Sequence, residues 1–288
     1  MKAIRITCPT CLEKGTLNVD DGKIKNSERG VTAINIKENT ICKHSFVAYI
    51  DRNLVARDCF AVDFTIKLPE IEMKENEGNY DADDFKDLDI YLITLNLRAL
   101  TIASIFRGIF LKQKIVLIND ITIIDAHIFK LLDYCFEGTF EYDLSIISKK
   151  EYKNDKKKYK NHLIISKDTI INDPEKLLAS KKMKIENAIV QKFLSIPDTV
   201  SGLIILKNDI FKAHEIAKDA FNFVSGLSDN ERKNYSIYEL AEHINDHAGK
   251  LNIKLQKVYL DFLVDIIMYY FELDISKEVK PKDFLGYL

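Results

Sequence analysis

Over the first 65 residues, apolar and polar positions alternate in short runs separated by turn residues, a pattern typical of half-buried β-strands. The predicted strands are residues 16–19, 31–36, 46–50, 54–56 and 60–64. The turn-forming Asp20-Asp21-Gly22 is expected to join the first two strands in a hairpin. A second polar turn at residues 51–53 is expected to join the next two. This part of the chain is therefore predicted to be a β module.

From residue 90, apolar runs of strand length alternate with longer runs of helical spacing. The predicted strands are residues 90–95, 115–118, 143–147 and 162–166. The predicted helices are residues 97–112, apolar on nearly every face, a helix with a capping-type start at Thr122-Ile123-Ile124-Asp125, and a long helix from Asp173-Pro174 to Leu194. This alternation predicts a partly parallel sheet.

The last 80 residues have helical spacing only, and the predicted helices are residues 207–225, 236–248 and 252–273. Gly226 and Gly249 are the predicted stops of the first two. In the third, an apolar stripe predicts a core-facing side; it consists of Leu255, Tyr259, Phe262, Ile266 and Tyr270.

The predicted fold class is mixed α+β and α/β: an N-terminal β module, an α/β body and an all-helical C-terminal region. The corresponding division is residues 1–70, an acidic linker at 71–89, 90–206 and 207–288. The linker has eight Asp and Glu residues and few apolar ones. We therefore expect residues 85–288 to fold without residues 1–70.

Composition and charge narrow the class of protein. Of 288 residues, 47% are hydrophobic, enough for a sizeable core, so overall disorder is disfavoured. The net charge of −2 disfavours attraction of the whole surface to nucleic acid or anionic lipid. The N-terminus lacks the apolar run of a signal peptide, and no apolar run reaches membrane-spanning length. We expect a soluble, cytoplasmic protein with reduced cysteines.

Three of the five cysteines stand in a pattern typical of a metal site. Cys8-Pro9-Thr10-Cys11 is followed, about thirty residues later, by Cys42-Lys43-His44. Three thiolates and one imidazole are the number and kind of ligand that tetrahedral Zn²⁺ takes, and a filled set leaves no position for a catalytic water. We predict a structural zinc bound by Cys8, Cys11, Cys42 and His44, with Cys59 as the alternative to His44. The competing interpretation is ordinary buried cysteines.

These cysteines and the surrounding strands resemble the zinc-ribbon fold group, over about a quarter of the chain. That resemblance implies two knuckles at hairpin tips holding one metal, with the four residues above at the ligand positions. The chain departs from the common pattern because one residue, Lys43, separates the second ligand pair instead of two. The segment from Ile41 to Asp51 is also similar to the heads of uncharacterised zinc-ribbon proteins of Asgard-type archaea, which implies no particular activity.

Catalytic and cofactor signatures are absent from the sequence. None of the ten glycines forms a dinucleotide or phosphate-binding fingerprint. Cys135 lies on the apolar face of its predicted helix and His127 has no evident partner, so both are predicted to be non-catalytic. His243 and His247, four residues apart, lack the glutamate of a zincin motif and are predicted to be exposed helix residues.

One segment has a concentrated positive charge. Its lysines are Lys149, Lys150, Lys153, Lys156, Lys157, Lys158 and Lys160, with Tyr152 and Tyr159 between them. The favoured interpretation is a solvated loop between strands. The alternative is an anion-binding patch for the phosphate backbone of nucleic acid or for acidic lipid headgroups.

The function that these features favour is a non-enzymatic, zinc-binding interaction or regulatory protein, an adaptor whose body contacts a protein partner. A nucleic-acid-associated factor using the lysines is the first alternative. The order of elements after residue 90 vaguely resembles the central and distal parts of DENN-type regulators of small GTPases, without a diagnostic motif, which gives a second alternative. An enzyme whose site is assembled from distant residues is the weakest one.

Overall fold

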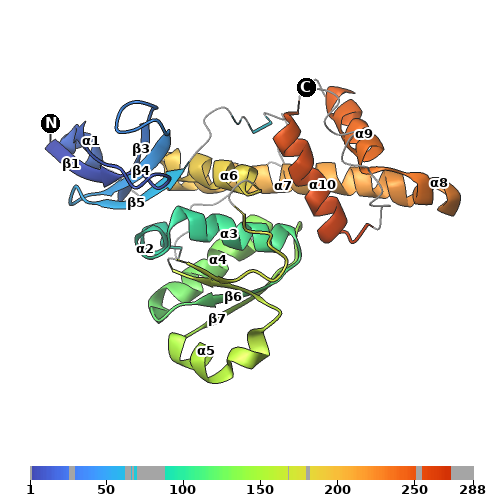
Figure 1. The fold of residues 1–288 in the computed structure, drawn as a ribbon, viewed down its shortest axis with the longest axis horizontal. Helices are drawn as coiled ribbons and strands as arrows, with labels where there is room; N and C mark the ends of the chain where they lie inside the picture. The colour runs from blue at the N-terminus through green and yellow to red at the C-terminus, as the bar shows by residue number, and fades with distance from the viewer. Residues whose placement is uncertain are drawn as a thin grey trace.

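A computed structural model describes residues 2–25, 30–61, 66, 68–69, 88–167, 169–179, 182–250 and 255–273. The predicted acidic linker lies outside the described residues, apart from Leu88 and Asp89. The predicted fold class is confirmed: antiparallel strands come first, a mixed sheet follows, and helices make up the C-terminal part (Figure 1).

The N-terminal part has two antiparallel sheets, one of two strands and one of three. The strands are β1 (Lys2–Thr7), β2 (Lys14–Val19), β3 (Val31–Ile36), β4 (Phe46–Asp51) and β5 (Ala56–Ala61). The second predicted hairpin is confirmed as β4–β5, but the first is wrong, because β2 pairs with β1 and β3 pairs with β4. The Asp20 carboxylate accepts a hydrogen bond from Gly22 N at 3.1 Å and starts a short helix, α1 (Asp21–Lys25), where a hairpin turn was predicted.

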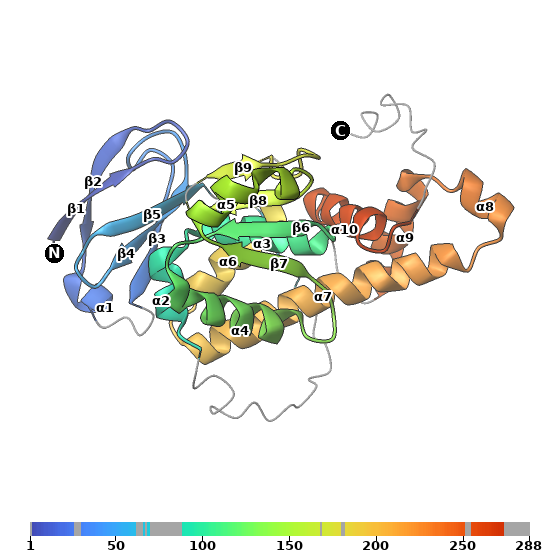
Figure 2. The same cartoon turned by 90° about the horizontal axis from the view of Figure 1, so that it is seen from below.

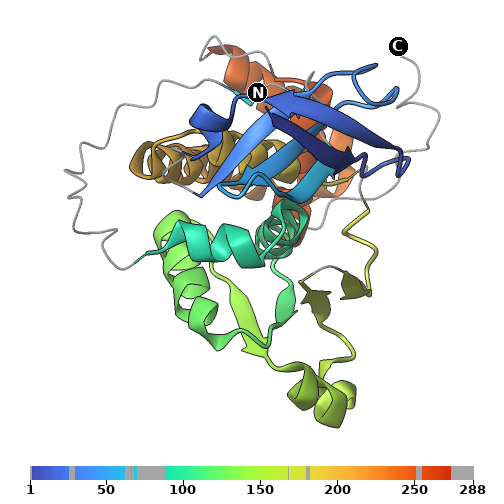
Figure 3. The same ribbon diagram turned by 90° about the vertical axis from the view of Figure 1, so that its left-hand side faces the viewer.

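Strand β4 is buried along its whole length, because both of its faces are covered. On one face, Phe46, Ala48 and Ile50 join the apolar cluster of the N-terminal sheets. On the other, Val47 and Tyr49 join the core that continues through the helices to the end of the described chain. An end-on view shows the blue strands lying over the green helices and strands of the body (Figure 3).

The sheet of the body has the order β7–β6–β8–β9, with β6, β7 and β8 parallel and β9 antiparallel. Its strands are β6 (Lys114–Ile118), β7 (Asp143–Ile147), β8 (Leu163–Ser166) and β9 (Ile170–Asn172). In this register Ile115 lies opposite Leu144 and Leu163. The predicted partly parallel sheet is confirmed, and the short edge strand β9 is an addition to it.

Helices cover both faces of this sheet. The helices of the body are α2 (Ile90–Asn96), α3 (Ala99–Phe110), α4 (Asp125–Phe136), which follows the 3₁₀ turn η2 (Thr122–Ile124), and α5 (Lys149–Asp155), which leads into the 3₁₀ turn η3 (Lys156–Tyr159). Helices α3 and α4 lie on one side of the sheet and α5 on the other (Figure 1). Gly108 allows α3 to approach closely, because a Cβ there would lie 2.7 Å from the Ile115 side chain.

Three local predictions in the body are wrong. Residues 90–95 form helix α2, because the Asp89 side chain accepts from Leu92 N at 3.0 Å and caps a helix whose Ile90 and Ile93 are buried together. The Asp173 carboxylate accepts from the backbone of Leu177 and Leu178 and so closes a turn, while the helix itself begins only at Lys184. The predicted capping of the helix after Thr122 is also absent, since η2 and α4 have no side-chain cap.

The C-terminal helices are α6 (Lys184–Ser195), α7 (Thr199–Ser225), α8 (Asp229–Asn234), α9 (Ile237–Lys250) and α10 (Lys257–Tyr269). Of these helices, α6 packs on α3 and α7 packs on α4. Helix α7 runs from the body to the end of the molecule that carries α8 and α9 (Figure 2). It continues without a break through residue 206, which was the predicted end of the α/β domain. It stops at Gly226 as predicted, whereas α9 continues through Gly249 to Lys250.

No single helix of the described chain has both the length and the apolar character needed to cross a membrane. Helices α2 and α3 reach that length and hydropathy only when taken together, and they are bent by 104° with respect to each other.

Candidate metal centre

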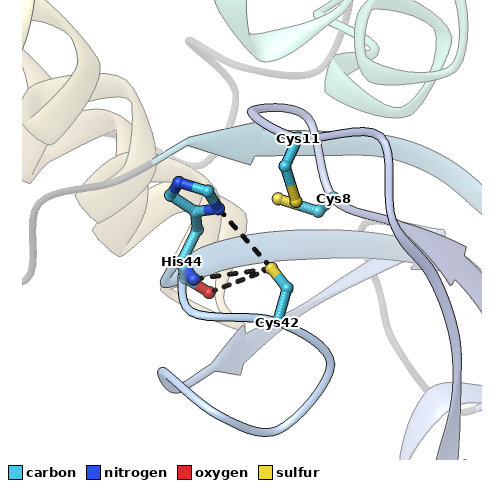
Figure 4. A group of neighbouring side chains, drawn as sticks. All are labelled: Cys8, Cys11, Cys42 and His44. Atoms are coloured by element: carbon cyan, nitrogen blue, oxygen red, sulfur yellow. Dashed lines mark hydrogen bonds between the residues drawn. The ribbon is translucent and has the colours of Figure 1, made fainter.

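Two loops bring the predicted ligands together. Cys8 and Cys11 lie in the loop between β1 and β2, and Cys42 and His44 lie in the loop between β3 and β4, so each pair sits at the tip of a hairpin (Figure 4). The first loop is closed by backbone hydrogen bonds between Cys8 and Glu13 and between Leu12 and Cys8. Backbone N–H groups of Thr10 and His44 each point at a cysteine sulfur, at 3.4 Å.

The four ligand atoms form one compact group, in which every pair lies within 4.8 Å. The Cys42 sulfur and His44 Nδ1 are 3.7 Å apart. In a tetrahedral site with Zn–S bonds of about 2.3 Å, two sulfur ligands lie about 3.8 Å apart. Small side-chain adjustments therefore suffice for all four to bind one ion, and the group can hold a metal such as zinc.

The thiols in this group affect each other's protonation. Burial raises the pKa of Cys8, but hydrogen bonds from the Cys11 and Thr10 backbone outweigh that effect, so its pKa is lowered overall. The backbone hydrogen bond from His44 lowers the pKa of Cys42, but burial and the neighbouring Cys8 and Cys11 sulfurs raise it to about 11. The first thiolate thus opposes the second, and a divalent cation would remove that opposition by neutralising both.

Other candidate ligands do not join the group. Cys59, the predicted alternative to His44, is half-buried on β5, and burial raises its pKa. Within the part of the chain that the structure describes, the Cys₃His group is the only set of at least three His, Cys, Asp or Glu side chains close enough to share a metal. The fourth member of the cluster is therefore His44.

The remaining candidates from the sequence have structural surroundings. Burial raises the pKa of Cys135, which lies in the core. His127 accepts a hydrogen bond from Asp89 N at 3.1 Å, a partner that the sequence did not indicate. His247 lies 3.2 Å from an Asp219 carboxylate oxygen, and the ring of His243 stacks on Phe223.

The lysine-rich segment is not the loop that was favoured. Lys149, Lys150 and Lys153 are on α5, and Lys156, Lys157 and Lys158 form η3, with Lys160 directly after it. The Ser148 hydroxyl caps α5 by accepting from Glu151 N at 3.1 Å. Five of the seven predicted lysines line one pocket: Lys153, Lys156, Lys157, Lys158 and Lys160.

A contact that the sequence did not reveal joins the metal-bearing part to the body. The Asp58 carboxylate on β5 accepts a hydrogen bond from Ala99 N at 3.0 Å, at the first residue of α3. Arg98, the residue before the helix, provides no side-chain cap of its own. The two partners are 41 residues apart, so only the assembled fold shows that Asp58 caps this helix.

Comparison with known proteins gives no relatives. No protein-family model matches this chain, and neither a curated protein nor a solved structure matches it.

Proposed function

We propose that this chain is a non-enzymatic, cytoplasmic adaptor protein in which Cys8, Cys11, Cys42 and His44 bind one structural Zn²⁺. The observation that carries the proposal is the convergence of these four ligand atoms from two hairpin tips. Three sulfurs and one nitrogen are a soft donor set that suits zinc and complete its tetrahedron, which leaves no position for a water nucleophile. All five cysteines are free, as a reducing compartment requires.

Zinc would cross-link two sheets that also share one apolar cluster. The β1–β2 sheet has only two strands, and a two-stranded sheet is marginally stable alone. Bridging its loop to the β3–β4 loop fixes the sheets relative to each other, and metal-binding free energy then adds directly to the free energy of unfolding.

The loop that carries Cys8 and Cys11, which we call the knuckle, is also suited to contact a partner protein. Leu12 follows Cys11 directly, is 72% exposed and has a left-handed backbone conformation with φ of 63°. Most of this side chain is left uncovered by the described chain, and a partner protein would bury it. The metal would keep Leu12 in one orientation for that contact.

The test combines metal analysis with recovery of partners, using matched cysteine variants of the full chain. Wild type and Cys59→Ser are expected to contain about one zinc per chain, and Cys8→Ser to lose it. Proteins recovered by affinity purification with wild type and Cys59→Ser are expected to be absent with Cys8→Ser. Substoichiometric zinc in wild type contradicts the metal site. Equal recovery of partners with Cys8→Ser contradicts the role of the knuckle.

A further inference from the structure

A pocket of about 1150 Å³ lies on the face of the body sheet opposite α3 and α4. We call it the lysine pocket, after Lys153, Lys156, Lys157, Lys158 and Lys160, which line it. Its walls come from α5 and η3 on one side and from β8 and β9 on the other. Nothing about the metal centre enters into its formation, so its role is independent of the adaptor proposal.

Helix α5 and the turn η3, which carry all of these lysines except Lys160, are packed against the sheet. Between the lysines, Tyr152 and Tyr159 turn inward, are 9% and 5% exposed, and pack with Val116, Ile118 and Ile164 of the sheet. The Asn172 amide donates to the backbone carbonyls of Lys160 and His162 at 2.9 Å, which ties the β9 edge to the end of the lysine segment. The ordered backbone therefore places these lysines around one space.

The charge of this space is unbalanced. The described residues of its lining include five lysines and a single carboxylate, Asp155. Among the ion pairs of the described residues, none includes any of these five lysines. Like charges held close together raise the free energy of the folded state, and a bound polyanion would relieve that repulsion.

The side chains of the lysine pocket favour a compact ligand over a nucleic-acid strand. Base stacking needs exposed aromatic rings, but Tyr152 and Tyr159 are packed against the sheet. No arginine is among the described residues that line the pocket, so the planar guanidinium fork is missing there, whereas lysine binds phosphate as a point charge. Ile164 and the 44% exposed Ile171 add an apolar surface for a carbon framework.

We propose that the lysine pocket binds a small organic molecule with several phosphate groups, either free or as the headgroup of a lipid. The ammonium groups would contact the phosphates, and Ile171 would contact the framework that carries them. The volume of the pocket is sufficient for a ligand of this size.

The first measurement is calorimetric titration of the zinc-loaded full chain with inositol hexakisphosphate, at a salt concentration of about 0.15 M. Saturable binding to wild type is expected. The variant Lys156→Gln/Lys157→Gln/Lys158→Gln is expected to bind roughly tenfold or more weakly. A matched control, Lys2→Gln/Lys14→Gln/Lys37→Gln, removes the same charge from exposed lysines of the N-terminal sheets and is expected to bind as wild type does. Thermal unfolding of each variant without ligand verifies that it is folded.

The second measurement distinguishes the two sources of the ligand. Phosphatidylcholine vesicles containing phosphatidylinositol bisphosphate are compared with vesicles of equal charge made with phosphatidylserine. Preference for the bisphosphate vesicles, lost in the triple pocket variant, assigns a lipid headgroup. Binding of the free hexakisphosphate without vesicle binding assigns a soluble ligand, and either result supports the proposal. It is overturned if neither probe binds, if the control variant loses as much affinity as the pocket variant, or if a short RNA binds more tightly than the hexakisphosphate.

Discussion

At the scale of single residues, Arg107 places a charge in the middle of the core. Its side chain on α3 is 1% exposed and donates to Glu186 of α6 at 2.9 Å and to Asp265 of α10. Glu186 is fully buried, whereas Asp265 is 34% exposed. Replacing both members of such a buried pair with apolar side chains of the same shape changes the free energy of unfolding little. Removing only one member lowers it strongly, because the other charge is left buried without a partner. The group therefore links three helices that are distant in sequence, α3, α6 and α10.

Removing one partner of this pair tests that interpretation. Arg107→Met leaves Glu186 without a counter-charge in an apolar site and is expected to lower the free energy of unfolding by about 3–5 kcal/mol. Arg107→Met/Glu186→Met is expected to regain most of that loss. Lys112→Met breaks an exposed ion pair with Glu272 and is expected to have little effect. Denaturant titration measures all three. A double variant as unstable as Arg107→Met would show that the methionines do not fit the core and that charge is not the cause.

At the scale of elements, the contact between β5 and α3 couples the metal-bearing sheets to the body. The first N–H groups of a helix lack partners within it, and Asp58 satisfies one of them at the start of α3. Asp58→Ala is expected to lower the free energy of unfolding by about 0.5–2 kcal/mol, as for other caps. Asp58→Asn keeps the acceptor oxygen and is expected to lose less. Hydrogen exchange of the Ala99 amide should accelerate in the alanine variant. Unchanged protection there would mean that the cap is dispensable.

An element could be predicted from the sequence where neighbouring residues determine it, and could not where contacts with other parts of the chain decide. The grouping of Cys8, Cys11, Cys42 and His44 could be predicted from two short motifs, although the sequence left Cys59 open as the alternative to His44. Helices α3 and α4 and strand β6 were predicted correctly, because a long apolar run favours a buried helix and a short one a buried strand. Residues 90–95 are apolar at nearly every position and suit a strand or a helix equally, so the cap at Asp89 and the packing of Ile90 and Ile93 decided the outcome.

The sequence of the lysine segment does indicate a helix, although its charge favoured the interpretation as a solvated loop. Tyr152 and Tyr159 are seven residues apart, the spacing of one helix face, and Ser148 precedes them as a cap. Both tyrosines pack on the sheet and make α5 and η3 an ordered support. By contrast, the closure of the lysine pocket by β9 and the capping of α3 by Asp58 depend on contacts between distant segments, which one sequence does not show.

At the scale of the whole molecule, one core extends from the N-terminal sheets to α10. Val47, Tyr49 and Phe60 pack in the same cluster as Ile93 of α2 and Phe262 of α10. Because β4 is covered on both faces, its apolar side chains serve the metal-bearing sheets and the body at once. The continuous core therefore predicts that the two parts unfold together, even though a change in composition separates them in the sequence.

Removing residues 1–70 decides between this prediction and the sequence-based expectation that residues 85–288 fold alone. Without β3, β4 and β5, the apolar cluster of the body loses Val47, Tyr49 and Phe60, and the side chains that pack around them become exposed to water. The 85–288 fragment is therefore expected to unfold at a lower temperature than the full chain, to bind a hydrophobic dye and to lose near-ultraviolet circular dichroism. Val47→Ser in the full chain alters the same contact without truncation and is expected to shift the unfolding temperature in the same direction. A fragment with a sharp transition at the full-length temperature and no dye binding would establish two independent domains.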